Sequence, residues 1–130
     1  MPVRNDPGVA VTTRRTILVC DDEEGVRESI KLVLSDDYDI QFAHNGLEAI
    51  EQLKNLSPAV MLLDVKMPKV NGMETLKQIK RMKPKLPVIV VTGYQSVETA
   101  QEAIKNGASD YIPKPFESAH LKKAIAQLIK

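Results

Sequence analysis

Apolar and polar residues follow two alternating patterns from Thr16 to the end of the chain. Short, uninterrupted apolar runs are typical of buried strands, and longer segments with an apolar side chain every three or four positions are typical of half-buried helices. The predicted strands cover residues 17–20, 38–43, 59–63, 87–91 and 109–112. The predicted helices cover residues 24–34, a segment capped by Asn45 that reaches Leu53, and residues 72–82, 96–105 and 117–129.

This alternation predicts an α/β fold in which five parallel strands are joined by helices. Because crossovers between parallel strands are almost always right-handed, the five helices should cover both faces of the sheet. The expected architecture is a doubly wound, flavodoxin-like five-stranded parallel sheet with strand order 2-1-3-4-5. Residues 1–14 show no apolar period, so we expect a flexible N-terminal tail, followed by one domain of residues 15–130.

Composition excludes several classes of protein. A hydrophobic content of 43% and a charged content of 27% are those of a folded protein without membrane spans, and no apolar run is long enough to cross a bilayer. A formal net charge of +1 provides no bulk field for nucleic acid, so direct nucleic-acid binding is not expected. The single cysteine, Cys20, and the lack of a signal sequence favour a cytoplasmic location.

Polar side chains follow four of the predicted strands, and ligands bind such sheets beyond the carboxyl ends of the strands. The residues at these positions are Asp21, Asp22, Asp64, Thr92 and Lys114. Three carboxylates gathered at one edge would repel one another and raise one another's pKa unless a cation neutralised them. An all-oxygen donor set suits a hard ion, so the sequence predicts a site for Mg²⁺, with Mn²⁺ as an alternative.

Asp64 is the best candidate for a nucleophile toward phosphorus, because it stands alone after a central strand whereas Asp21 and Asp22 are adjacent and better placed to share a metal. The hydroxyl of Thr92 and the ammonium of Lys114 could each bind a phosphoryl oxygen. Each of these residues alone could be a helix cap, a turn or a solvated charge. Their joint placement at four strand ends favours a common site.

The chain resembles the receiver domains of two-component response regulators over residues 16 to 129. Four segments carry the resemblance: ILVCDDE at 17–23, LLDVKMP at 62–68, VVTG at 90–93 and DYIPKPF at 110–116. The resemblance implies that Asp64 is the phosphoacceptor and that Mg²⁺ is held by Asp21, Asp22, Asp64 and the backbone carbonyl of Lys66. It also implies that Thr92 and Lys114 bind the phosphoryl oxygens and that the Lys114–Pro115 bond is cis.

The same resemblance implies a signalling role rather than an enzymatic one. A sensor histidine kinase or phosphotransfer protein would donate the phosphoryl group, and a downstream effector protein or output domain would respond, with a homodimer on activation also compatible. Thr92 moving toward the phosphoryl group would let Tyr111 rotate from an exposed to a buried position. The surface formed by the fourth helix, fifth strand and fifth helix would change with it.

Two other functions remain open at this point. A receiver-like scaffold could bind its partner without phosphorylation. A haloacid-dehalogenase-type phosphatase also uses an Asp nucleophile, but its second acid would be expected at position 66, which is a lysine here. Lys66 and Tyr94 each lie two residues past a predicted site residue and border the phosphorylation site.

A second group of charges has no place in this site. Five basic residues lie close together between positions 77 and 85: Lys77, Lys80, Arg81, Lys83 and Lys85. Such a group is typical of a solvated helix face, and it could also favour an acidic partner.

Overall fold

The computed structural model describes residues 14–66, 72–94 and 96–129. Its elements in chain order are β1 (Thr16–Cys20), α1 (Glu24–Leu34), β2 (Asp39–Ala43), α2 (Gly46–Leu53), β3 (Val60–Leu63), α3 (Gly72–Met82), β4 (Val88–Thr92), α4 (Val97–Lys105), β5 (Asp110–Pro113) and α5 (Ser118–Leu128). All of the predicted strands and helices are present. The predicted tail lies outside the described residues except for Arg14, whose guanidinium donates to the backbone carbonyls of Ser35 and Tyr38.

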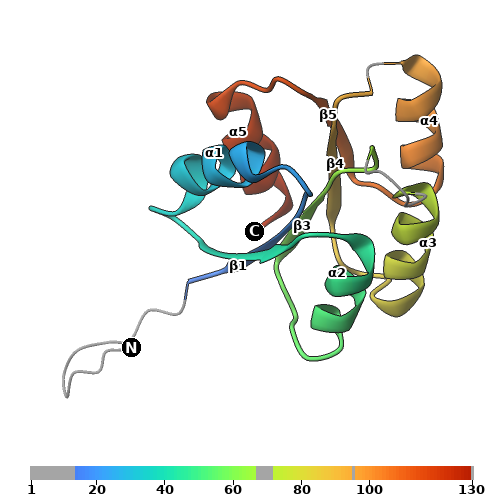
Figure 1. Ribbon diagram of the computed structural model, residues 1–130, viewed down its shortest axis with the longest axis horizontal. Coiled ribbons are helices and arrows are strands. Elements are labelled where there is room, and N and C mark those ends of the chain that lie inside the picture. Colours follow the sequence, from blue (N-terminus) through green and yellow to red (C-terminus); the bar gives the residue numbers. More distant parts are fainter. Residues whose placement is uncertain (1–13, 67–71, 95, 130) are drawn as a thin grey trace.

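The strands form one parallel sheet in the order β2-β1-β3-β4-β5, which confirms the predicted doubly wound arrangement. Figure 1 shows α1 and α5 together on one side of the sheet and α2, α3 and α4 on the other. Because consecutive strands run in the same direction, all their carboxyl ends lie at one edge. The predicted site residues therefore share that edge.

The sheet is buried on both faces, so its central strands are apolar at every position rather than alternating. Leu18, Met61 and Val90 point to the cluster that packs under α2, α3 and α4. Ile17 and Leu62 point to the cluster under α1 and α5. No helix in the parts of the chain that the structure describes is long and apolar enough to cross a membrane.

Local sequence signals set the ends of the helices. The side chain of Asn45 accepts a hydrogen bond from the backbone N–H of Glu48 and so caps α2, and Ser96 caps α4 through the N–H of Thr99. Gly107 has a φ of 106°, a conformation that favours glycine, and it lies just after the end of α4. The Lys114–Pro115 bond is cis, as the resemblance implies.

Each strand begins one residue away from its predicted start, and two strands also end one residue later than predicted. β4 runs through Thr92 and β5 through Pro113, each one residue further than the apolar runs indicate. Thr92 pairs with Pro113 in the parallel register, and the N–H of Lys114 donates to the carbonyl of Thr92 over 2.8 Å. Backbone pairing thus extends past the last apolar residue, and Pro113 is tolerated because β5 is an edge strand.

Candidate functional site

Two buried carboxylates lie at the centre of the sheet edge. Asp21 and Asp64 follow β1 and β3, and each is only 2% exposed. The backbone N–H of Asp21 donates to the carbonyl of Ala43, and that of Asp64 donates to the carbonyl of Cys20. Because the hydrogen bonding of the sheet continues into these two residues, both side chains are presented from rigid backbone rather than from loops.

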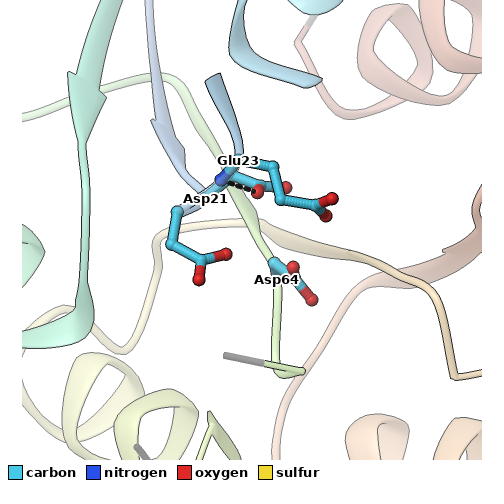
Figure 2. Close-up of side chains that lie close together, drawn as sticks. Asp21, Glu23 and Asp64 are labelled. Carbon is cyan, nitrogen blue, oxygen red and sulfur yellow. Dashed lines mark hydrogen bonds between the residues drawn. The ribbon is translucent and has the colours of Figure 1, made fainter. Parts of the chain in front are cut away.

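Four acidic residues form a compact group that we call the acidic cup: Asp21, Asp22, Glu23 and Asp64. One carboxylate oxygen from each lies within 4.8 Å of the others. Figure 2 shows the side chain of Asp21, directly after β1, and that of Glu23, two residues further on, close to the side chain of Asp64. The structure therefore brings the predicted acidic residues together. It adds Glu23, which the sequence offered only as the third member of an acidic run.

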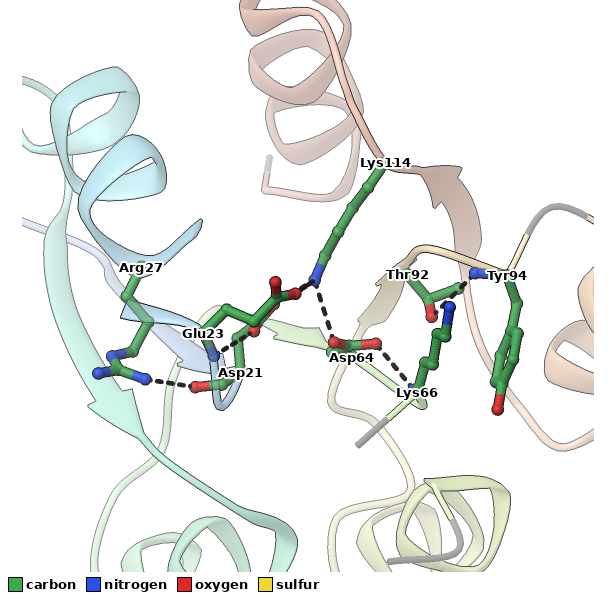
Figure 3. Close-up of polar contacts among 8 residues, drawn as sticks. All are labelled: Asp21, Glu23, Arg27, Asp64, Lys66, Thr92, Tyr94 and Lys114. Atoms are coloured by element: carbon green, nitrogen blue, oxygen red, sulfur yellow. Dashed lines mark hydrogen bonds and ion pairs between the residues drawn. The ribbon is translucent and has the colours of Figure 1, made fainter. Parts of the chain in front are cut away.

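Lys114 reaches into the acidic cup from the end of β5 (Figure 3). Its Nζ lies 2.8 Å from Oδ2 of Asp21, 3.0 Å from Oδ2 of Asp64 and 3.0 Å from Oε1 of Glu23. Burial opposes the charged form of this lysine, but the hydrogen bonds to Asp21, Asp64 and Glu23 outweigh it and raise the pKa. The ammonium is thus a fixed counter-charge rather than a mobile one.

Burial is the main reason that the pKa of Asp21 is raised above its ordinary value. The bond from Lys114 and the N–H of Glu23 oppose this effect, and the charge of Asp64 adds to it. The predicted repulsion between carboxylates thus contributes to the raised pKa of Asp21, and desolvation is the larger cause. Burial thus opposes the ionised form of Asp21, and a further cation beside it would favour that form.

The donor set of the acidic cup fits a hard divalent cation. All four side chains offer carboxylate oxygens, two of them are buried, and their oxygens are near enough to share one ion. The backbone N–H of Lys66 donates to Oδ1 of Asp64 over 2.8 Å, which fixes the orientation of that carboxylate. The carbonyl of Lys66 as a metal ligand stays a prediction.

Thr92 lies at the carboxyl end of β4 and is fully buried. Its hydroxyl oxygen accepts a hydrogen bond from the backbone N–H of Tyr94 over 3.4 Å. The Nζ of Lys66 lies 5.2 Å from the centre of the Tyr94 ring, so a cation–π contact links the two residues. Figure 3 shows Thr92, Lys66 and Tyr94 on the side of Asp64 away from Glu23.

An open hollow of about 960 Å³ connects the acidic cup to solvent. Asp64 and Lys114 line its floor together with polar residues, and Val26, Val33 and Phe116 provide an apolar wall between α1 and α5. A group carried by another protein can therefore approach Asp64 across an apolar surface. The site is accessible although its key carboxylates are largely buried.

Tyr111, the predicted switch residue, is half-buried on β5 and packs against the cluster under α2, α3 and α4. Its hydroxyl oxygen is enclosed, and no hydrogen-bond partner lies near it in residues 14–66, 72–94 and 96–129. Burial raises the pKa of this phenol. The ring therefore already lies inward with an unsatisfied hydroxyl, whereas the resemblance implied an exposed position before phosphorylation.

Cys20 is fully buried at the end of β1 and is expected to be chemically inert. Burial, followed by the negative charge of Asp21 and then of Asp64, raises the pKa of the thiol to about 12. We expect no reaction of the native protein with Ellman's reagent at pH 8, and rapid reaction in concentrated guanidinium chloride. Equal rates in the two conditions would contradict the observed burial.

Comparisons with known proteins agree with this geometry. A family model of the response regulator receiver domain matches residues 17–126. The response regulator MprA of Mycobacterium ulcerans is 37% identical over 115 residues, which make up 88% of this chain and 50% of that protein. The chain spans about half the length of the curated relatives it matches.

Solved structures give the same result. The receiver domain protein of Clostridium thermocellum has a TM-score of 0.81 at 36% identity, covering 88% of this chain and 94% of that one. The CheY-like receiver domain protein of Methanospirillum hungatei JF-1 has a TM-score of 0.85 at 29% identity, and the match covers 90% of this chain and 94% of that one.

The sheet order, together with an acidic edge facing a lysine from the last strand, defines a CheY-like receiver domain. The chain belongs to the response regulator receiver domain family of two-component systems. It is therefore a signalling domain.

Proposed function

We propose that Asp64 accepts a phosphoryl group from a sensor histidine kinase or a phosphotransfer protein, and that Mg²⁺ is required. The observation that carries this proposal is the setting of Asp64. Its Oδ1 accepts from the N–H of Lys66, its Oδ2 contacts the ammonium of Lys114, and the rest of the acidic cup lies beside it. A buried carboxylate held at both oxygens is oriented for attack in one direction.

The residues divide the reaction between them. One oxygen of Asp64 forms a bond to phosphorus while the bond from phosphorus to the donor breaks, so that an acyl phosphate forms and the donor leaves. Mg²⁺ bound by Asp21, Asp22, Asp64 and the carbonyl of Lys66 would neutralise charge on the transferred group. Lys114 and Thr92 are placed to bind phosphoryl oxygens, which would stabilise the product.

The test is incubation of the protein with acetyl phosphate and Mg²⁺, followed by intact mass measurement. We expect one phosphoryl adduct per chain, labile at alkaline pH, and none when EDTA replaces Mg²⁺. Asp64→Asn should remove the adduct completely, because an amide is not a nucleophile toward phosphorus under these conditions.

A matched control is Asp37→Asn, which removes an exposed carboxylate from the loop between α1 and β2. It should be phosphorylated like the wild type. An adduct that persists in Asp64→Asn would place the acceptor at another residue and contradict the proposal. A wild type that gains no adduct from any donor would favour the scaffold function, in which the partner binds without phosphorylation.

We also propose that Tyr111 reports phosphorylation to the surface of α4, β5 and α5, where an output domain or effector protein would bind. An enclosed hydroxyl without a partner costs about 1–3 kcal/mol, so the inward position of Tyr111 is only weakly stabilised. Lys114 already contacts Asp64, so the added charge there would chiefly draw Thr92 toward it and shift this balance.

Tyr111→Phe is expected to stabilise the domain by about 1 kcal/mol, because it deletes the unsatisfied hydroxyl and keeps the ring. Urea denaturation measures this change, and acetyl phosphate labelling should be unaffected. Tyr94→Phe, on an exposed ring, should change the free energy of unfolding by less than about 0.5 kcal/mol. A destabilised Tyr111→Phe would mean that the hydroxyl has a partner and that the switch works differently.

A further inference from the structure

Six basic residues gather at the carboxyl ends of α3 and α4, away from the acidic cup. This basic surface consists of Lys77, Lys80, Arg81, Lys83, Lys85 and Lys105. Four of them, Lys77, Lys80, Arg81 and Lys105, line a shallow hollow of about 390 Å³ together with Asn106 and Gly107. The whole chain carries a net charge of only +1, so a third of its 18 basic residues are concentrated here.

These charges are poorly compensated within the domain. Lys77 pairs with Glu74 over 3.3 Å, and the Nζ of Lys80 donates to the carbonyl of Leu86 over 2.7 Å. In residues 14–66, 72–94 and 96–129, no ion pair involves the other four cations or Lys80. The repulsion between these neighbouring cations would therefore be reduced if a partner brought carboxylates to this surface.

Helix dipoles explain only part of this arrangement. Lys80, Arg81 and Lys105 lie in the last turns of their helices, where cations are favourable. Lys83 directly follows α3, and its N–H donates to the carbonyl of Ile79, so it also lies within reach of the dipole, whereas Lys85 lies further along in the loop to β4. The helix dipole therefore does not account for the positive charge at Lys85.

An apolar groove of about 460 Å³ adjoins the basic surface. Pro58, Pro84, Pro87, Met82 and Leu86 form its apolar lining, and Lys83 and Lys85 stand at its margin. Arg81 lines the basic hollow, and the next two residues, Met82 and Lys83, line the groove, so adjacent residues of the chain contribute to both. Met82 is 38% exposed, which leaves an apolar contact available among the cations.

We propose that this surface docks an acidic protein segment that carries an apolar side chain between its carboxylates. The carboxylates would pair with Arg81, Lys83 and Lys85, and the apolar side chain would enter the proline-lined groove. Duplex nucleic acid would gain nothing from that groove. Single strands would need stacking aromatics, and none is among the residues that line the groove or the hollow.

The test is fluorescence anisotropy with a labelled synthetic peptide in which Glu and Asp residues flank one Leu. The double charge reversal Arg81→Glu with Lys85→Glu is expected to weaken binding at least about tenfold. Replacing Leu by Ser in the peptide should weaken binding further, and added salt should weaken it as well because the cations are exposed.

The matched control is Lys122→Glu with Lys123→Glu on α5, which lies on the opposite side of the sheet and changes the net charge equally. This variant should bind the peptide within about twofold of the wild type. Unchanged phosphorylation by acetyl phosphate shows that each variant is folded. Equal losses in the two double variants, no peptide binding at low salt, or tighter binding of a labelled DNA duplex than of the peptide would each overturn the proposal.

Discussion

Lys114→Met is expected to destabilise the domain by about 3 kcal/mol in EDTA at neutral pH. Asp21 and Asp64 have side chains that are 3% and 1% exposed, and the ammonium of Lys114 is the cation that contacts both. Removing one partner of a buried ion pair leaves a desolvated charge uncompensated, which costs about 3–5 kcal/mol. Urea denaturation in EDTA measures the effect directly.

The same variant should recover much of its stability in excess Mg²⁺, since a divalent ion held by the acidic cup would supply the missing positive charge. A suitable control is Lys54→Met, which breaks the exposed pair with Glu51 and should cost less than about 1 kcal/mol in either buffer. If the two variants lost equal stability in EDTA, Lys114 would be a surface charge and the acidic cup would be neutralised in another way.

Gly72→Ala is expected to destabilise the domain by about 3 kcal/mol and to reduce phosphorylation of Asp64. A Cβ at position 72 would lie 2.3 Å from Cα of Val65 and 2.4 Å from its carbonyl oxygen, so backbone rather than a flexible side chain must move. Overpacking of this kind costs about 1–3 kcal/mol and sometimes more. Because Val65 directly follows Asp64, the displacement should reach the proposed acceptor carboxylate.

Gly25→Ala provides the comparison for Gly72→Ala. Gly25 lies in α1, nothing stands within 4 Å of the added Cβ, and alanine favours the helix by about 0.5–1 kcal/mol. We expect Gly25→Ala to be as stable as the wild type or more so, with normal labelling by acetyl phosphate. A Gly72→Ala variant of wild-type stability would contradict this prediction, because it would mean that the backbone at Val65 can shift at little cost in free energy.

The fold could be predicted from the sequence because its strands are buried on both faces. Runs such as Val88–Val91 admit few other structures when amphipathic segments surround them, and Asn45, Ser96 and Gly107 mark helix ends by local chemistry. The strand ends were less predictable. Thr92 and Pro113 pair through the backbone, which side-chain polarity does not reveal.

The grouping of the candidate site residues could also be predicted from the sequence. Parallel topology alone brings Asp21, Asp64 and Lys114 to one edge, so their proximity follows from the order of the strands. Which carboxylates Lys114 contacts depends on side-chain distances, and the part played by Glu23 could not be read from its position in an acidic run. The enclosed hydroxyl of Tyr111 likewise depends on packing between distant segments.

The hydrogen bond from the N–H of Lys114 to the carbonyl of Thr92 joins the two residues proposed to sense the phosphoryl group. Because this bond ties the ends of β4 and β5 together, a displacement of one residue should be transmitted to the other. One backbone hydrogen bond thus links the two contacts to the phosphoryl group, so we expect Thr92 and Lys114 to respond together rather than in separate steps.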